Sequence, residues 1–154
     1  MGENFKRKDE LNTLIATFEM QLKNHGLEFY QIEQFEEIIG HYMDLGKNKM
    51  ALKACTAAID QYPYSTNLMI EKSQVLLNLE KYEKSLEILD KAIALQPNDP
   101  EIFSMRGTVY LVQGLHEKAI KNFQKAIPLS EEKADLHYQI GLAYQNAFKY
   151  KKAI

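Results

Sequence analysis

Cysteine is nearly absent from the sequence: Cys55 is the only one, so no disulfide can form within the chain and nothing indicates an oxidising compartment. Long apolar runs are also missing. No stretch approaches the ~18 apolar residues of a membrane span, and Met1 to Leu22 lacks the apolar core of a secretory signal. A basic excess is missing too, because the net charge is -2. We therefore expect a cytoplasmic, soluble protein that binds neither nucleic acid nor membrane.

Residues arranged for catalysis or metal binding are likewise missing. The four histidines include no pair at i, i+3 or i, i+4, and none lies at ligand spacing from the cysteine. The glycines occur singly, so there is no phosphate-binding loop. Adjacent glutamates such as Glu36 and Glu37 point about 100° apart on a helix and form no catalytic pair. We expect no enzyme, no cofactor and no metal, and we interpret Cys55 as a buried, inert thiol.

What the sequence does contain is an internal period of about 34 residues, the interval between Pro63 and Pro97. An interval sustained over three copies predicts a helical solenoid, in which neighbouring repeats bury a continuous core between them. The same interval relates three other sets of positions: Ala58, Ala92 and Ala126; Tyr42, Leu76, Tyr110 and Tyr144; and Ala51, Ser85, Ala119 and Ala153.

The repeat predicts paired helices at about 32–45 and 48–61, 66–79 and 82–95, 100–113 and 116–127, with a further first helix at about 130–147. Ser65 is a candidate N-cap, and Asp99 can cap a helix whose first residue is Pro100. The predicted segments are an N-terminal tail and capping helix over 1–31, repeats over 32–65, 66–99 and 100–133, and a truncated repeat over 134–154.

The N-terminal segment departs from the period. We expect Met1 to Asp9 to be a frayed terminus, and the apolar residues from Leu11 to Leu22 predict a helix with one apolar stripe. Such an end unit covers the first repeat of a solenoid. The alternative is a helix that binds a partner elsewhere.

The third repeat carries Phe103, Gly107, Tyr110, Ala119, Phe123 and Ala126 at set offsets. In these positions the chain resembles the tetratricopeptide repeat (TPR) family. It departs from the family's pattern at Ser73, Ser85 and Ile39, where small residues are usual or the helices approach closely. We expect Gly107 and Gly141 to allow close approach opposite Ala119 and Ala153. The resemblance implies an all-α fold, a right-handed superhelical α-solenoid of antiparallel helix pairs, and a non-catalytic module that binds other proteins.

In the family, offsets 2, 5, 6, 9, 12 and 13 of each first helix line a concave groove. Of the 24 positions mapped in this way, seven are acidic and none is Lys or Arg. The resemblance thus implies a groove for a peptide or helical segment that is basic or partly apolar, whereas the alternative is an ordinary solvated helix face. Acidic chaperone tails should not bind, because the places of the basic clamp hold Glu36, Gly40, Glu71, Glu101 and Met105. The predicted groove consists of Glu33, Glu36, Gly40, Met43, Ile70, Glu71, Gln74, Leu77, Glu101, Ser104, Met105, Thr108, Leu111, Val112, Asp135, Tyr138 and Leu142.

The fourth repeat stops at Ile154, a few residues into its expected second helix. We therefore expect either a fragment of a longer protein or a second chain that covers this end. One alternative function follows, a regulatory or localising N-terminal region of a protein with an enzymatic or membrane-associated C-terminal part. Another is self-association through Ile140, Tyr144 and nearby apolar groups.

Overall fold

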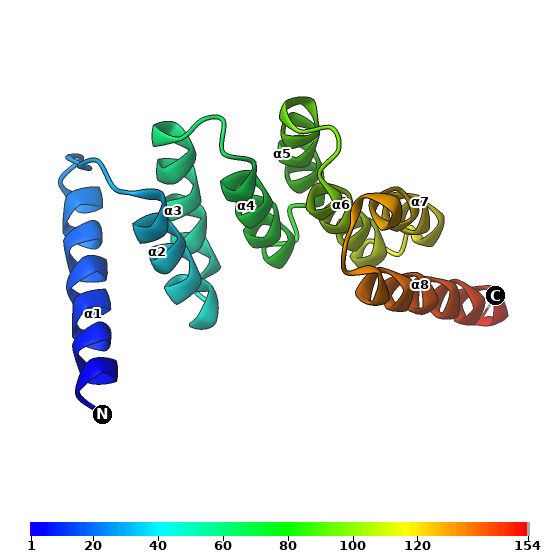
Figure 1. Cartoon of the computed structure of the whole chain (residues 1–154), viewed down its shortest axis with the longest axis horizontal. Helices are drawn as coiled ribbons and strands as arrows, with labels where there is room; N and C mark the ends of the chain where they lie inside the picture. The colour runs from blue at the N-terminus through cyan, green and yellow to red at the C-terminus, as the bar shows by residue number, and fades with distance from the viewer. Residues whose placement is uncertain (154) are drawn as a thin grey trace. The chain divides into compact units, whose positions relative to one another are not determined.

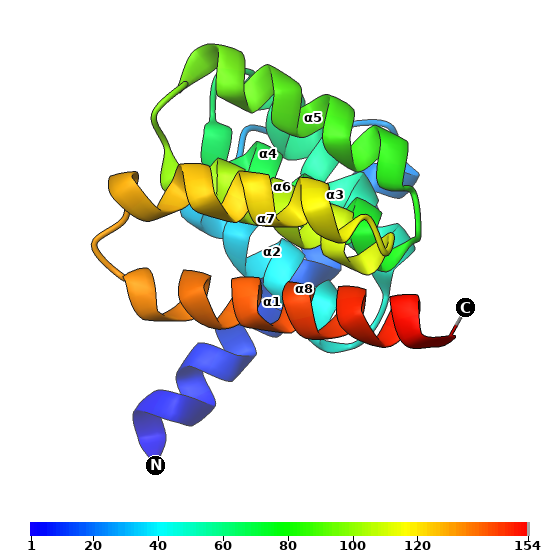
Figure 2. The same ribbon diagram turned by 90° about the vertical axis from the view of Figure 1, so that its right-hand side faces the viewer.

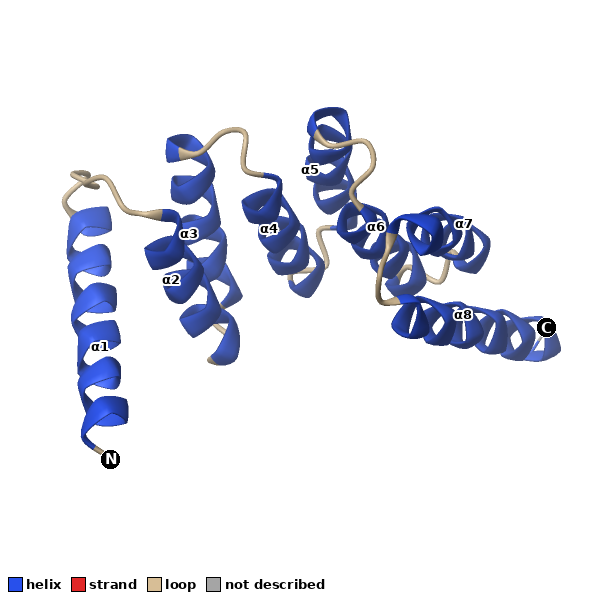
Figure 3. Cartoon of the chain, in the orientation of Figure 1, coloured by secondary structure: helices blue, strands red, loops and turns tan. Residues whose placement is uncertain are grey.

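The computed structural model describes residues 1–153, which form eight α-helices and one short 3-10 helix, with no strand among them (Figures 1 and 3). The helices of the described residues are α1 (Gly2–Lys23), α2 (Ile32–Asp44), α3 (Asn48–Gln61), α4 (Thr66–Asn78), α5 (Tyr82–Leu95), α6 (Pro100–Val112), α7 (His116–Ala126), the 3-10 helix η1 (Ile127–Leu129) and α8 (Lys133–Ala153).

The chain divides into two compact units: unit 1 is Met1–Leu68 and unit 2 is Met69–Ile154. The helix pairs predicted from the period are present within them. For α3 and α5 the predicted bounds 48–61 and 82–95 agree with the structure. Asp99 accepts a hydrogen bond from the Glu101 backbone N–H at 2.9 Å, and Pro100 is the first residue of α6, as predicted.

Three turns between paired helices share one geometry. Gly46, Glu80 and Gly114 recur at the interval of the repeat and adopt the left-handed conformation, with φ of 67°, 58° and 78°. In each turn the N–H of this residue donates to the carbonyl three residues earlier at 2.9–3.0 Å, and the next N–H donates to the carbonyl five residues before it at 2.8–2.9 Å. These paired bonds satisfy carbonyls left open at a helix end. Glu80 therefore occupies a position at which the other two turns use glycine.

The core of unit 1 is an aromatic cluster that joins α1 to the first helix pair. Phe18 is fully buried, and its ring lies 5.8 Å from the Tyr30 ring and 6.5 Å from the Phe35 ring. The Tyr62 hydroxyl donates to the Tyr30 carbonyl oxygen at 2.8 Å. The Gln61 side chain holds the same connection by accepting from the Tyr30 N–H at 3.0 Å. The apolar stripe of α1 is thus packed within unit 1 around Phe18.

Two predictions about helix ends are wrong. The helix α1 begins at Gly2, so the expected frayed stretch Met1 to Asp9 is helical apart from Met1. Strong helix formers, Lys, Arg and Glu, fill this exposed stretch and explain the difference. The helix α8 continues without a break from Lys133 to Ala153, although the period predicted an end near Ala147. Asn146 and Ala147 supply neither glycine nor proline, and nothing there stops a helix.

In unit 2, the helix α7 packs against both α6 and α8, and α7 and α8 run in opposite directions side by side (Figure 2). Phe123 of α7 is fully buried, and a Cβ atom added at Gly107 would lie 2.6 Å from its ring. Gly107 thus makes room for the Phe123 ring, and the expected close approach to Ala119 stays a prediction. At Gly141 a Cβ atom would meet nothing within 4 Å. Ala153, expected on a facing helix, lies in the same helix as Gly141, because α8 runs unbroken from Lys133 to Ala153.

The helices α4 and α5 are joined by a buried pair of serines. The Ser85 hydroxyl donates to the Ser73 carbonyl oxygen at 2.9 Å, which leaves the Ser73 hydroxyl to donate to the Ser85 oxygen at 2.7 Å. Both serines are fully buried. Where the family pattern has small residues, this chain therefore uses a satisfied polar contact.

Candidate protein-interaction surface

The predicted groove residues fall on α2, α4, α6 and α8, the first helices of their pairs, which we call the leading helices. Four of them, Glu33, Glu36, Gly40 and Met43, lie on α2 in unit 1, and the other thirteen lie in unit 2. Because successive residues of an α-helix are about 100° apart, the groove residues of each leading helix lie on one side of that helix. A groove that runs through both units stays a prediction.

In unit 1, the α2 set combines charge with a half-buried apolar side chain. Glu33 is exposed, whereas Glu36, Gly40 and Met43 are half-buried. The opposite side of α2 is anchored in the core, since Phe35, Ile38 and Ile39 are buried. The core contacts therefore fix which side of α2 carries the glutamates.

In unit 2, the accessible members of the set are found on each leading helix. Val112 and Tyr138 are the most open apolar members, at 55% and 66% exposure. Leu77 and Met105 are buried, at 7% and 8% exposure, and contribute little to a surface. Half-buried members are Ile70, Glu71, Gln74, Ser104, Thr108, Leu111 and Leu142, and the exposed carboxylates are Glu101 and Asp135.

Polar members of the set make local hydrogen bonds that orient them. The Gln74 Nε2 group donates to Asn78 Oδ1 at 3.0 Å, one turn along α4. The Thr108 hydroxyl donates to the Ser104 carbonyl oxygen at 3.0 Å, so its oxygen can still accept. These side chains can therefore present an amide and a hydroxyl oxygen to a bound segment.

Four of the five carboxylates of the set are not neutralised by a cationic side chain of the described residues. Within the part of the chain that the structure describes, Glu33, Glu36, Glu101 and Asp135 have no lysine or arginine at ion-pair distance. Unpaired charge of one sign favours association with a cationic segment and makes it sensitive to salt.

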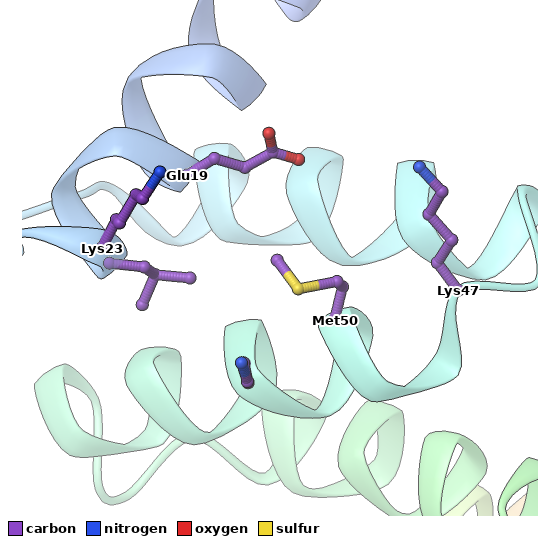
Figure 4. A pocket seen from close by; sticks show the side chains of 6 residues that line it. Glu19, Lys23, Lys47 and Met50 are labelled. Atoms are coloured by element: carbon purple, nitrogen blue, oxygen red, sulfur yellow. The ribbon is translucent and has the colours of Figure 1, made fainter.

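Unit 1 also has a hollow of about 430 Å³ that sequence reasoning did not find. Figure 4 shows Lys23 and Lys47 on opposite sides of Met50, with Glu19 nearby. Glu19 accepts a hydrogen bond from the Tyr42 hydroxyl at 2.8 Å. Burial raises the pKa of Tyr42 well above its ordinary value, and the hydrogen bond to Glu19 and the charge of Glu19 raise it further. Glu19 thus links α1 to α2.

The two α8 residues predicted to mediate self-association, Ile140 and Tyr144, differ in exposure. Tyr144 is 57% exposed, whereas Ile140 packs against the core cluster around Phe123 and is only partly accessible. The predicted contact surface on α8 therefore rests on Tyr144 more than on Ile140.

Over residues 1–153, no helix is both long and apolar enough to cross a membrane. In the same range, no group of three or more His, Cys, Asp or Glu side chains could hold a metal ion. Cys55 forms no disulfide and is buried, as its interpretation required.

The family whose model matches this chain is described as "Psidin, N-terminal TPR repeats region", and it matches residues 35–154. A curated relative, the TPR repeat-containing protein YpiA of Bacillus subtilis (strain 168), is 24% identical over 113 residues. That alignment covers 73% of this chain and 27% of YpiA, so the chain spans about a quarter of the relative's length.

Solved structures show the same fold. The crystal structure of MamA is 23% identical, with a TM-score of 0.73 over 99% of this chain and 91% of that one. The first TPR of Spaghetti (RPAP3), bound to the HSP90 peptide SRMEEVD, is 21% identical, with a TM-score of 0.65 over 72% of this chain and 88% of that one. The all-α solenoid class predicted from the sequence is thereby confirmed. With the family match over residues 35–154, the chain belongs to the tetratricopeptide repeat proteins, in the family of the Psidin N-terminal TPR repeats region.

Proposed function

We propose that this chain is a non-catalytic protein-interaction module that binds a peptide or helical segment of a partner on the predicted groove residues of its leading helices. One observation carries the proposal: accessible apolar side chains, such as Val112 and Tyr138, lie on the same helices as carboxylates with no cationic partner in the described chain. The peptide held by the TPR of Spaghetti supports a segment as the kind of ligand.

The partner segment is basic or mixed basic and apolar. Exposed ion pairs contribute only about 0 to 1 kcal/mol each, so the carboxylates set the association rate and the salt dependence. Burial of the apolar members supplies most of the affinity, at about 25 cal/mol per Å² of apolar surface removed from water. On the groove residues, an acidic peptide such as SRMEEVD should bind weakly, because the carboxylates there repel it.

The test is selection from a library of random peptides displayed on phage, followed by titration of the selected peptides. The proposal expects lysine or arginine beside apolar residues, and an affinity at least tenfold weaker in the double variant V112S/Y138S. A matched control is L95S/Y64S, which removes apolar side chains that are 42% and 79% exposed outside the groove set. Selection of acidic sequences whose affinity falls in V112S/Y138S, or equal loss in the control, would refute the proposal.

A second candidate is the N-terminal regulatory or localising region of a longer protein with an enzymatic or membrane-associated C-terminal part. It is favoured by the length of YpiA, of which this chain spans only 27%. Sequencing of the transcript beyond the codon for Ile154 tests it. A stop codon directly after that position would rule it out.

A further inference from the structure

A second surface of unit 2, on α6 and α7, differs from the predicted groove in position and in charge. A hollow of about 440 Å³ there is lined by Arg106, Tyr110, Lys118, Lys121, Asn122 and Lys125, which we call the basic pocket. At about 100° per residue, Arg106 and Tyr110 lie on the side of α6 roughly opposite Ser104 and Thr108. A ligand in this pocket would therefore leave the groove residues of α6 uncovered.

The cations of the pocket are largely uncompensated. Arg106 pairs with Asp90 of α5 at 3.1 Å. Lys118, Lys121 and Lys125 have no carboxylate at ion-pair distance anywhere in residues 1–153. Their i, i+3, i+7 spacing places them in a row on α7 that is roughly 10 Å long, at about 1.5 Å per residue.

Packing holds these cations near one another despite their like charge. The Tyr110 ring lies 6.0 Å from the Arg106 guanidinium carbon and 5.6 Å from the Lys118 Nζ. The Lys125 Nζ lies 5.8 Å from the Phe103 ring centre. Aromatic faces attract cations electrostatically, so the rings partly offset the repulsion and keep the positive groups around the pocket.

Two polar groups of the pocket are buried without a partner. Asn122 is 8% exposed, and its Nδ2 donates to the Lys118 carbonyl oxygen at 2.8 Å, but its Oδ1 has no hydrogen-bond partner. The Arg106 Nε, a donor, is buried and unpaired as well. Buried unpaired polar atoms are unfavourable, and a planar guanidinium matches the oxygens of phosphate or carboxylate groups. A rotation of the Arg106 side chain would let its Nε donate to an oxyanion in the hollow, whereas Asn122 Oδ1, an acceptor, could take only a donor such as a backbone N–H of the bound segment.

We propose that the basic pocket binds a segment of a protein partner that carries two or more oxyanions, phosphate or carboxylate, separated by roughly 5 to roughly 10 Å, the distances that three and seven residues span along a helix. The row of three lysines sets this spacing, because a single small anion could contact only part of it. The site lies outside the predicted groove and does not depend on the function proposed for it.

The experiment titrates the chain with labelled ten-residue peptides and follows fluorescence anisotropy at low and at moderate salt. One peptide carries two phosphoserines three positions apart, roughly 10 Å in an extended chain. The second has glutamates at those positions, and the third has glutamines as the neutral reference. We expect the phosphoserine or the glutamate peptide to bind more tightly than the neutral one, and the stronger of the two identifies the source of the oxyanion.

Variants locate the site. K121E/K125E should weaken binding by about tenfold or more, since both lysines are exposed and their charge is reversed. The matched control, K47E/K53E, reverses two exposed lysines around the hollow of unit 1 and should change the affinity less than threefold. The groove variant V112S/Y138S should also leave it unchanged, so failure of the groove proposal is distinguishable.

Three results would overturn the inference. The first is that neither charged peptide binds more tightly than the neutral one. The second is that the control K47E/K53E loses as much affinity as K121E/K125E. The third is that an RNA oligonucleotide or phosphatidylserine vesicles bind these lysines more tightly than both peptides, in which case the pocket serves a different class of partner.

Discussion

Gly107 and Gly141 form a matched pair that tests how the leading helix of the third repeat packs. They lie one repeat apart, at the same place in the period, and both are in α-helices. A Cβ atom at Gly107 would lie 2.6, 2.7 and 2.9 Å from three ring carbons of Phe123, which is fully buried. A Cβ atom at Gly141 would meet no atom within 4 Å. The same substitution therefore meets a packed ring at one position and open space at the other.

The magnitudes follow from two opposing terms. Alanine in place of glycine stabilises a helix interior by about 1 kcal/mol. Overpacking of a filled core costs about 1 to 3 kcal/mol, and here the ring has to move. We expect Gly107→Ala to lower the free energy of unfolding by about 1 to 2 kcal/mol, since contacts this short place the overpacking cost at the high end. Gly141→Ala should raise the free energy of unfolding by about 0.5 to 1 kcal/mol.

Urea unfolding followed by the helical circular dichroism signal measures both effects. With a slope of about 1 to 3 kcal/mol per molar urea, the two midpoints should move in opposite directions by an amount that is easily resolved. On a Phe123→Leu background, Gly107→Ala should cost less than in the parent chain, because the smaller side chain relieves the overlap. If Gly107→Ala were as stable as the unsubstituted chain, the packing of Gly107 against Phe123 would be wrong.

Four further outcomes are expected. Ser85→Ala should destabilise unit 2 by about 1 to 3 kcal/mol, because it leaves the Ser73 hydroxyl buried without an acceptor. The double variant Ser73→Ala, Ser85→Ala should be close in stability to the parent chain. Equal losses in urea midpoint for the single and the double variant would contradict this. Tyr42→Phe should cost about 1 kcal/mol at pH 7. The pKa of Tyr42 is raised from 10.0 in the folded state, so the stability that its hydroxyl contributes is complete below pH 10 and falls as the pH rises above 10. The difference in free energy of unfolding between Tyr42→Phe and the parent should therefore be smaller at pH 10.5 than at pH 7. Phe18→Ala should lower the free energy of unfolding by about 3 to 5 kcal/mol, and a loss below about 1 kcal/mol would show that α1 adds little to unit 1. Glu80→Gly should raise the free energy of unfolding by about 1 kcal/mol, and with it the thermal midpoint, because glycine adopts the positive φ of position 80 without strain. A lowered midpoint would contradict the turn geometry.

Helix positions could be predicted from the sequence wherever a repeat contains its own stop signal. Gly46 and Pro63 frame α3, and its bounds were predicted correctly. The end of α8 could not be predicted, because the period supplied an expected turn at a place where no residue breaks a helix. The side of each helix on which a residue lies could be predicted, but the extent to which its side chain is buried could not. Leu77 and Met105 lie at the edge of the wheel arc, and their burial depends on the neighbouring helices.

Partners across helix interfaces were the other limit of sequence reasoning. The period marked Gly107 as a site of close approach, but only the structure shows that the Phe123 ring fills the space. It marked Ser73 and Ser85 as departures without showing that they bond to each other. The spacing of Lys118, Lys121 and Lys125 is visible in the sequence, but these lysines lie on α7, outside the leading helices on which the groove was predicted.

The most direct test of the proposed function is photo-crosslinking of a selected library peptide to a reactive residue placed either on a leading helix or on the second helix of a pair. Thr108 of α6 is a groove position, and Glu87 of α5 is an exposed position outside the groove set. The proposed function predicts strong crosslinking from position 108 and none above background from position 87. Crosslinking from position 87 that equals or exceeds that from position 108 would contradict it.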